Sequence, residues 1–224
     1  NQFKGRYSYN TICDHCKHNS VVDSSFHELD LSIQNLDTLH DCLKNYFKPK
    51  PLDGKYNCSH CPKAQSAHRE ILLKSLPPTL NLQLLRFVYD TQRNTRQKLN
   101  SFIIFPEILD MTPYLYNAKT NGNVNSINRP SRPNPFDLSS NTYHSILSNG
   151  TPRDRSNIYV LSAVLIHRGS SPHSGHYIAH IKDRVTKDWY KFNDDAVERI
   201  GPQLQVSTEG ENISIVEDRT DHVK

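Results

Sequence analysis

The sequence has 224 residues, with 27 Lys and Arg against 23 Asp and Glu, which gives a formal net charge of +4 when His is neutral. This length allows one large domain or a smaller domain with appendages, and it excludes a long repeat array. So slight a positive excess does not indicate a dedicated nucleic-acid or membrane-surface protein, and no run of eighteen apolar residues predicts a membrane span.

Two segments in the first half of the chain alternate as a strand with one buried face does. They are residues 26–33 and 79–90. Their apolar positions on one face are Leu29, Leu31 and Ile33 in the first segment and Leu80, Leu82 and Leu84 in the second. Residues 36–47 instead carry apolar side chains three and four positions apart, which predicts a helix that ends before Pro49. Cys42 shares the apolar stripe of this helix, so we interpret it as a buried small hydrophobic residue rather than a reactive thiol.

A polar segment separates these elements from the rest of the chain. In residues 117–157, Asn, Ser, Pro and Gly supply 22 of 41 positions, so we expect a disordered insertion, in keeping with a mean hydropathy of −0.69 for the chain. Both flanks have the composition of strands, which indicates that the insertion interrupts one sheet rather than separating two domains. Residues 201–224 are also polar, and we expect a tail there.

Three strand-like runs follow the insertion, at residues 158–167, 176–182 and 188–193, each rich in β-branched or aromatic residues. The last two predict a hairpin that turns around Asp183 to Lys187. Strands dominate and one helix is clear, so the predicted fold class is α+β, built on a mainly antiparallel sheet.

Four of the five cysteines form two C-x-x-C pairs, Cys13 with Cys16 and Cys58 with Cys61, a pattern typical of metal binding in a reducing compartment. Together they supply the four sulfurs of a tetrahedral structural Zn2+ site. The 41 residues between the pairs exceed the usual spacing of a short ribbon, so intervening elements must return the chain to the site. The alternatives are coincidence, a thioredoxin-like redox pair, for which no βαβ context is present, or replacement of one sulfur by a nearby histidine. The nearby histidines are His15, His18, His60 and His68.

A second cluster of polar residues lies in the last two predicted strands. If their hairpin turns midway between Arg184 and Val185, His176 lies directly opposite Asn193 and shares its face. An imidazole held by a side-chain amide is the base of a nucleophilic triad with its orienting partner. The same pair also suits a hydrogen-bonded structural histidine, and the geometry by itself leaves both interpretations open.

Over these residues the sequence is similar to a known family. SGHYIAHIKD (174–183) and WYKFNDD (189–195) resemble the histidine box of the ubiquitin-specific proteases, papain-like cysteine peptidases that cleave after the C-terminal glycine of ubiquitin. The two C-x-x-C pairs resemble the zinc-binding fingers of that family, and LPPTLNLQLLRFVYD (76–90) resembles its central palm strand. The resemblance covers nearly all of residues 5–200 apart from the insertion.

This resemblance implies a papain-like α+β fold, present here as the fingers and palm, with a zinc-ribbon-like tip on the fingers. It implies that residues 1–200 are part of a catalytic domain in which His176 is the general base, Asn193 orients it, and Asp194 assists catalysis or the oxyanion. It also implies that the four paired cysteines bind a structural zinc ion and that Tyr177 and the loop before His176 line the channel for the ubiquitin tail. The expected partners are ubiquitin and ubiquitinated proteins.

The nucleophilic cysteine of the family has no counterpart in this sequence. In the family it lies in a box resembling G-x-x-N-x-G-N-T-C at the start of a helix, and no such box occurs before His176. Cys42 lies in mid-helix without the Gly-Asn-Thr lead, so we do not assign it that role. The chain begins with Asn1, and we expect the nucleophile upstream of it, which would make this chain a carboxyl-terminal portion that is inactive alone.

Three functions compete at this point. The first is deubiquitination by thiol-dependent hydrolysis after the C-terminal glycine of ubiquitin, with the cysteine supplied upstream. The second is a catalytically inactive pseudoprotease or scaffold that binds ubiquitin without turnover. The third, a zinc-ribbon nucleic-acid binder, is disfavoured because no basic stripe interleaves with aromatic residues. We expect no membrane partner, and reduced cysteines together with the resemblance favour the cytoplasm and nucleus.

Overall fold

The computed structural model describes residues 1–92, 94–116, 157–171, 174–202, 204 and 212–219. The chain divides into two compact units, Asn1–Leu115 with Arg155–Lys224, and Tyr116–Asp154. The elements described below all belong to the first unit. The predicted insertion at 117–157 lies outside the described residues except for Asn157. No helix in the described part of the chain is long and apolar enough to span a membrane.

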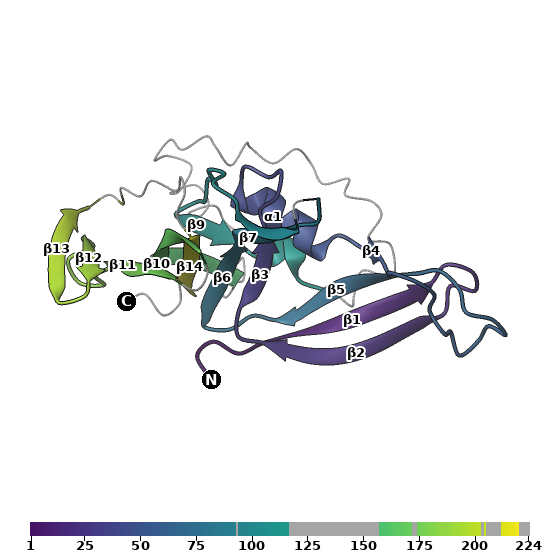
Figure 1. The fold of residues 1–224 in the computed structure, drawn as a ribbon. Helices are drawn as coiled ribbons and strands as arrows, with labels where there is room; N and C mark the ends of the chain where they lie inside the picture. The colour runs from purple at the N-terminus through teal and green to yellow at the C-terminus, as the bar shows by residue number, and fades with distance from the viewer. Residues whose placement is uncertain (93, 117–156, 172–173, 203, 205–211, 220–224) are drawn as a thin grey trace. The chain divides into compact units, whose positions relative to one another are not determined.

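The elements lie in two main sheets, a short hairpin and one α-helix (Figure 1). The strands of the first half of the chain are β1 (Gly5–Cys13), β2 (Asn19–Phe26), β3 (Leu29–Ser32), β4 (Lys50–Pro51), β5 (Ala67–Ser75), β6 (Thr79–Leu85), β7 (Phe87–Asp90), β8 (Thr95–Lys98) and β9 (Ile108–Asp110). The helices are α1 (Leu39–Phe47) and the 3-10 turn η1 (Thr112–Tyr114). The remaining strands are β10 (Ile158–Ser171), β11 (Ser174–Lys182), β12 (Trp189–Asn193), β13 (Ala196–Gly201) and β14 (Asn212–Arg219).

The first sheet has the order β2-β1-β5-β4, and all of its pairs are antiparallel. In Figure 1, β1, β2 and β5 run side by side as a long ribbon. The sequence predicted none of these three strands, because their residues do not alternate in the usual way. β2 reads NSVVDSSF and buries only its last residue, Phe26, so it has no apolar face for the pattern to reveal.

The second sheet has the order β13-β12-β11-β10-β14-β6-β3, with β9 also paired to β10. Its pairs are antiparallel except for β3 with β6, which are parallel, so the predicted mainly antiparallel α+β fold is confirmed. β9 and β10 pair from Ile158↔Asp110 to Val160↔Ile108, and the N–H of Met111 donates to the carbonyl of Asn157 at 2.9 Å. The residues that flank the insertion therefore pair with each other within one sheet.

The prediction of a polar tail is wrong over residues 212–219. Their backbone forms β14, which pairs antiparallel with β10 on one side and with β6 on the other. These polar residues form a strand because β10 and β6 each present a row of backbone N–H and C=O groups. A strand between β10 and β6 supplies hydrogen-bond partners to both rows. A polar composition gave no local signal for that long-range pairing.

The helix α1 packs against the apolar side chains of β3, the strand that precedes it in the chain. Thr38 caps it by accepting a hydrogen bond from the N–H of Asp41 at 3.1 Å, so it begins three residues later than the sequence predicted. Cys42 is fully buried, and burial raises the pKa of its thiol to about 11, which confirms that it is a core residue. The fully buried aliphatic residues packed with it include Leu29, Leu31, Ile33, Leu39, Leu43, Leu80 and Leu82.

A buried cation joins this core to the segment after β8. Arg86 is only 1% exposed, and its Nη1 donates hydrogen bonds to the carbonyls of Leu99 at 3.0 Å and Ser101 at 2.7 Å. The N–H of Leu99 in turn donates to the carbonyl of Arg86 at 2.6 Å. A guanidinium at this depth is tolerated because it is hydrogen-bonded, and it holds residues 99–101 against the end of β6.

Replacing Arg86 by Met is expected to lower the free energy of unfolding by about 2–4 kcal/mol. Met fills a similar volume, but it removes the buried guanidinium that donates to the carbonyls of Leu99 and Ser101. Urea unfolding followed by circular dichroism measures the change. Arg6→Met, at an exposed position, is the control and should change stability by less than about 0.5 kcal/mol; equal effects of the two substitutions would contradict the assigned role of Arg86.

Candidate functional site

The structure brings His176 and Asn193 together, but in a different register from the one predicted. β11 and β12 pair from Lys182↔Trp189 to Ala179↔Phe192, so Asn193 lies two positions from the residue directly opposite His176, and the prediction of direct opposition is wrong. Because side chains two apart on a strand share a face, the pair still meets diagonally. Nε2 of His176 and Oδ1 of Asn193 form a hydrogen bond.

The register differs because the turn is longer than assumed. The Asp183 carboxylate accepts hydrogen bonds from the N–H groups of Val185 at 2.9 Å and Thr186 at 2.6 Å, and from the Thr186 hydroxyl at 3.0 Å. These bonds, led by the N–H of Thr186, hold the pKa of Asp183 below its ordinary value. The N–H of Asp183 donates to the carbonyl of Asp188 at 2.8 Å, and Lys187 adopts a φ of 64° to close the loop.

The next turn places the third predicted residue beside this pair. Asn193 pairs with Ala196 where β12 meets β13, and Asp194 lies in the turn between them with a φ of 50°. The Asp194 side chain is exposed to solvent. Tyr177, next to His176 on β11, is 60% exposed. A half-buried imidazole is thus hydrogen-bonded to the Asn193 amide, with Asp194 in the turn that follows this amide and with Tyr177 on the opposite face of β11.

A second histidine, to which the sequence assigned no role, lies on the neighbouring strand. His167 is opposite Tyr177 in the pairing of β10 with β11, and their ring centroids are 4.8 Å apart. His167 is buried, and burial, followed by the charge of Lys98, lowers the pKa of its imidazole. Both effects favour the neutral form of the imidazole. A histidine within a strand pattern carries no sequence signal that separates a packed ring from a reactive one.

Two glycines allow the backbone before His176 to pack against this ring. A Cβ at Gly175 would lie 2.2 Å from Nε2 of His167 and 2.4 Å from the Arg168 carbonyl oxygen. Gly169 has a φ of 148°, and a Cβ there would lie 2.7 Å from the Ser174 carbonyl oxygen. Nζ of Lys98 donates to the carbonyl of Gly169 at 2.6 Å. The backbone that presents His176 is therefore held by contacts that leave no room for side chains.

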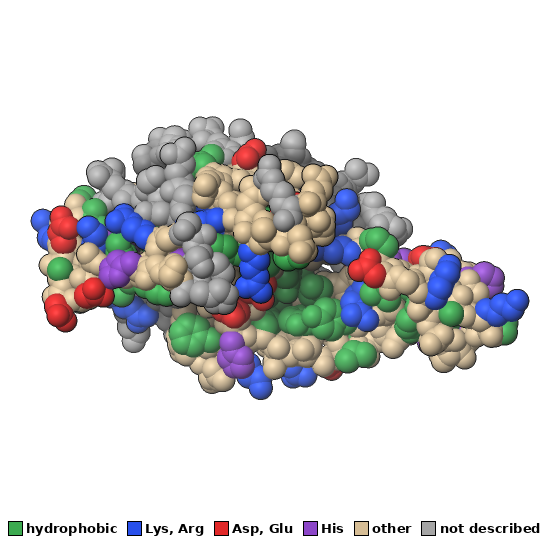
Figure 2. All heavy atoms as spheres, viewed as in Figure 1, with side chains coloured by type: hydrophobic (Ala, Val, Ile, Leu, Met, Phe, Trp, Pro, Cys, Tyr) green, Lys and Arg blue, Asp and Glu red, His purple; other side chains and the backbone are tan. Residues whose placement is uncertain are grey.

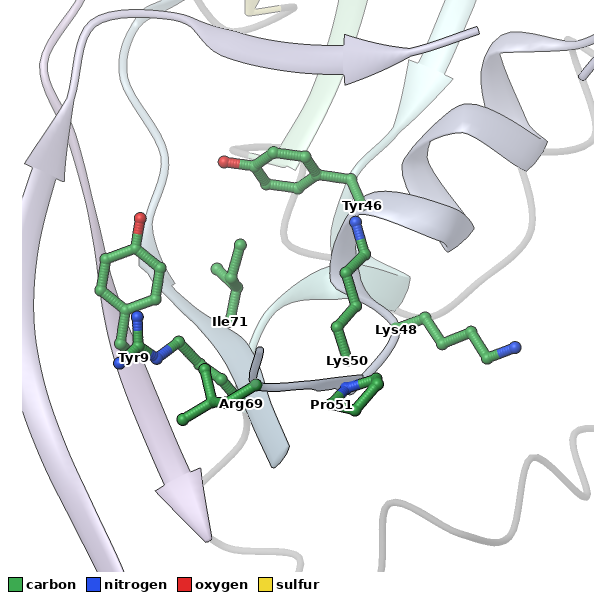
Figure 3. Close-up of a pocket in the computed structure, with 8 residues that line it drawn as sticks. Tyr9, Tyr46, Lys48, Lys50, Pro51, Arg69 and Ile71 are labelled. Carbon is green, nitrogen blue, oxygen red and sulfur yellow. The ribbon is translucent and has the colours of Figure 1, made fainter. Parts of the chain in front are cut away.

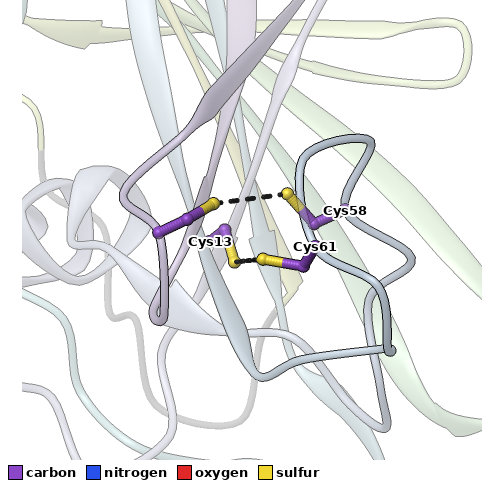
Figure 4. Close-up of side chains that lie close together, drawn as sticks. Cys13, Cys58 and Cys61 are labelled. Atoms are coloured by element: carbon purple, nitrogen blue, oxygen red, sulfur yellow. Dashed lines mark hydrogen bonds between the residues drawn. The ribbon is translucent and has the colours of Figure 1, made fainter.

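The two C-x-x-C pairs meet at the end of β1 (Figure 4). The Sγ atoms of Cys13 and Cys61 are 3.9 Å apart, those of Cys16 and Cys58 are 3.6 Å apart, and all four lie within 4.8 Å of one another. Sulfurs about 2.3 Å from a tetrahedral zinc ion are separated by about 3.8 Å, whereas a disulfide needs about 2.05 Å. The cluster therefore fits a tetrahedral cation and does not fit two disulfides.

The pairing of β1 with β5 returns the chain to this cluster across 41 residues. It runs to Cys13↔Ala67, and the N–H of Asp14 donates to the carbonyl of Ser66 at 2.9 Å. The second C-x-x-C pair precedes β5 in a loop that Tyr56 and Gln65 close by donating N–H groups to each other's carbonyls at 2.7 and 2.9 Å. The elements between the two C-x-x-C pairs thus bring the second pair back to the first, as the spacing of 41 residues requires.

The nearby histidines lie around the sulfurs rather than replacing one of them. Among the described residues, a group of three or more side chains able to hold a metal ion consists of the four cysteines. Nδ1 of His15 is 3.7 Å from Sγ of Cys61, and His68 instead contacts Asp14 at 2.7 Å. The N–H of Cys16 lowers the pKa of the Cys13 thiol to about 7, and desolvation followed by the neighbouring thiols raises that of Cys61 to about 12.

Replacing Gly175 by Ala is expected to lower the free energy of unfolding by about 1–3 kcal/mol and to shift the His176 ring resonances in proton–carbon NMR spectra, because the new methyl group displaces either the His167 ring or the backbone. Gly54→Ala is the control. A Cβ there has open space within 4 Å and meets only the strain of a φ of 79°, so it should leave those resonances in place. Unchanged His176 resonances in Gly175→Ala would refute the packing argument.

Comparison with known proteins identifies the family of this chain. Residues 1–217 match the family model described as ubiquitin carboxyl-terminal hydrolase. The chain is 42% identical over 211 residues to ubiquitin carboxyl-terminal hydrolase 48 of Danio rerio. The aligned region covers 93% of this chain and 17% of that protein. It is 35% identical over 204 residues to ubiquitin carboxyl-terminal hydrolase 26 of Oryza sativa subsp. japonica, covering 89% of this chain and 16% of that protein.

Solved structures with the same fold carry related sequences. The SAGA DUB module bound to ubiquitin aldehyde matches with a TM-score of 0.68 and 26% identity, over 99% of this chain and 42% of that chain. A yeast SAGA DUBm structure matches with a TM-score of 0.70 and 27% identity, over 97% of this chain and 41% of that chain. On the family model, the identities and the fold together, the chain belongs to the ubiquitin carboxyl-terminal hydrolase family.

Proposed function

We propose that this chain is the fingers and palm portion of a deubiquitinase, and that the complete catalytic domain hydrolyses the bond after the C-terminal glycine of ubiquitin. The main support is the hydrogen bond between His176 and Asn193. Because a side-chain amide oxygen only accepts, Nε2 of His176 carries the proton and Nδ1 is left as the base. The family membership and the similarity to ubiquitin carboxyl-terminal hydrolases support the same activity.

The nucleophilic thiol comes, in this proposal, from sequence upstream of the 224 residues. Cys42 is excluded because it lies in the core with its pKa raised to about 11 by burial, and the thiolate rather than the thiol is the nucleophile. The other four cysteines lie together in the sulfur cluster. The relatives extend well beyond this chain, which spans about a sixth of their length.

The reaction divides into acylation and deacylation. In acylation, Nδ1 of His176 takes the thiol proton, the thiolate attacks the carbonyl carbon of the terminal glycine of ubiquitin, and the leaving amine receives that proton as the C–N bond breaks. In deacylation, Nδ1 takes a proton from water, the hydroxide attacks the thioester, and the thiol is restored as the ubiquitin carboxylate leaves. Asn193 holds the ring plane through both steps, and Asp194 in the next turn assists catalysis or the oxyanion.

We also propose that Cys13, Cys16, Cys58 and Cys61 hold a structural zinc ion. Four protein sulfurs complete its coordination and leave no position for a substrate, so the ion would supply cross-linking rather than chemistry. The fit of the sulfur separations to a tetrahedron supports this proposal. Loss of the ion is expected to release the β1–β2 turn and the loop before β5, since these are joined there by few buried side chains.

The zinc proposal predicts about one zinc ion per chain in elemental analysis of purified protein. Cys16→Ser should reduce bound zinc at least about fivefold, because it removes one of four thiolate ligands. Cys42→Ala is the matched control, since it removes a buried thiol outside the cluster and should leave the zinc content unchanged. Metal-free protein with all five thiols freely titratable would refute the proposal.

The catalytic proposal predicts that a ubiquitin electrophile labels the protein only when the upstream sequence is present, as read by intact mass. In that extended protein, His176→Gln should lower turnover by at least about 10³-fold and Asn193→Ala by about 10- to 100-fold, because the first removes the base and the second only its orientation. His27→Gln, at an exposed position, should remain within about twofold. Ubiquitin binding by an extended protein that is never labelled would support a pseudoprotease instead.

We propose ubiquitin and ubiquitinated proteins as the partners, and the cytoplasm and nucleus as the location. Free thiols suit these reducing compartments. Imaging of the tagged full-length protein tests the location, and its accumulation in a secretory compartment would contradict it.

A further inference from the structure

A cavity of about 190 Å³ lies where the end of α1 and the strand β4 approach the faces of β1 and β5 (Figure 3). It shares no lining residue with the His176 site or with the sulfur cluster. Its volume is below the roughly 300–1,000 Å³ of pockets that take drug-sized ligands. It is therefore of a size for one or two side chains of a peptide.

The floor of the cavity is apolar. Ile71 and Leu52 contribute aliphatic side chains, and Tyr9 and Tyr46 contribute aromatic rings. All four are half-buried. Figure 3 shows the Tyr46 ring over the cavity, with Ile71 between it and Tyr9. Burial raises the pKa of Tyr46, so its hydroxyl stays protonated and can donate a hydrogen bond. Such a floor favours an apolar side chain and offers one donor beside it.

The rim of the cavity is positively charged. Lys48, Lys50 and Arg69 line it, and no Asp or Glu does. The Arg69 guanidinium is held in place, with its Cζ 5.3 Å from the centre of the Tyr9 ring and its Nε donating to the Thr11 hydroxyl at 3.1 Å. Figure 2 shows hydrophobic side chains gathered in a hollow of the surface, with Lys and Arg side chains and also some Asp and Glu side chains around it.

Lys50 is the cation best placed for a ligand. In Figure 3 its side chain extends toward Tyr46, whereas Lys48 points away from the cavity. Among the described residues, the side chain of Lys50 makes no ion pair or hydrogen bond, so its charge is not compensated within this part of the chain. It lies on β4, which is the edge strand of its sheet and pairs there only with β5. A peptide that crosses this edge meets Lys50 first and the apolar floor next.

We propose that this cavity binds an acidic segment of a partner protein, with Glu or Asp carboxylates beside Lys50 and beside Arg69 and an apolar side chain between them on the floor. The uncompensated cations select the occupant. A basic segment would be repelled, and a neutral apolar one would desolvate two cations without pairing either. The carboxylates of an acidic segment offer an acceptor to each of the two cations.

Fluorescence anisotropy with a labelled Glu-Leu-Glu-Leu-Glu peptide tests the proposal, using the complete 224-residue chain. We expect saturable binding that weakens as salt is added, and at least about tenfold weaker binding of the Gln-Leu-Gln-Leu-Gln counterpart. The double substitution Lys50→Gln with Arg69→Gln should weaken binding of the acidic peptide about tenfold. Lys4→Gln with Arg6→Gln is the matched control, because it removes the same charge at exposed positions outside the cavity.

Several results would overturn the proposal. Equal affinity for the two peptides would assign binding to the apolar floor alone, and equal losses in the two double variants would assign it to net charge. Competition by inorganic phosphate at the peptide's own concentration would indicate a simple anion site. Displacement of the peptide by ubiquitin would make the cavity part of the ubiquitin-binding surface, a result that leaves the proposed hydrolase activity unaffected. Circular dichroism of each variant confirms that it is folded.

Discussion

The antiparallel pairing of β10 with β11 is the interaction on which both the second sheet and the histidine site depend. β10 anchors the pair, because it also pairs with β14 and β9 and buries Tyr159, Val164 and Ile166 in the core. β11 is then aligned on a strand that cannot shift without exposing apolar surface. That alignment places His176 opposite Arg168.

The half-buried His176 therefore lies on a rigid support. His167 is buried behind it, and Gly175 brings the backbone against that ring. Asn193 ends β12, so the hydrogen-bond partner of His176 also stands on a strand rather than on a loop. Residues on packed strands hold a productive geometry more closely than residues on loops. The positions of His176 and Asn193 consequently follow from core packing.

The sulfur cluster lies in a part of the fold where hydrophobic packing is limited. The first sheet has little apolar core at that end, and its buried interior is partly polar. Ser8 donates to Asp23 at 2.5 Å and Asn10 donates to Glu70 at 2.7 Å, each across a pair of neighbouring strands. Hydrogen bonds of this kind contribute about 1 kcal/mol each. A cation held by four sulfurs would supply the cross-link that such a thin layer lacks.

What the sequence by itself determined is what local period and residue chemistry encode. Four features could be predicted from the sequence, because each depends on spacing within one element or one hairpin. They are the leucine alternation before and after α1, the burial of Cys42, the two C-x-x-C pairs, and the shared face of His176 and Asn193. Only the tertiary structure decided the register of that hairpin, where Asp183 enlarges the turn, and the insertion of β14 between β10 and β6. Strand pairing, and packing such as that of His167, depend on groups that are far apart in the chain. A local sequence pattern therefore does not predict them.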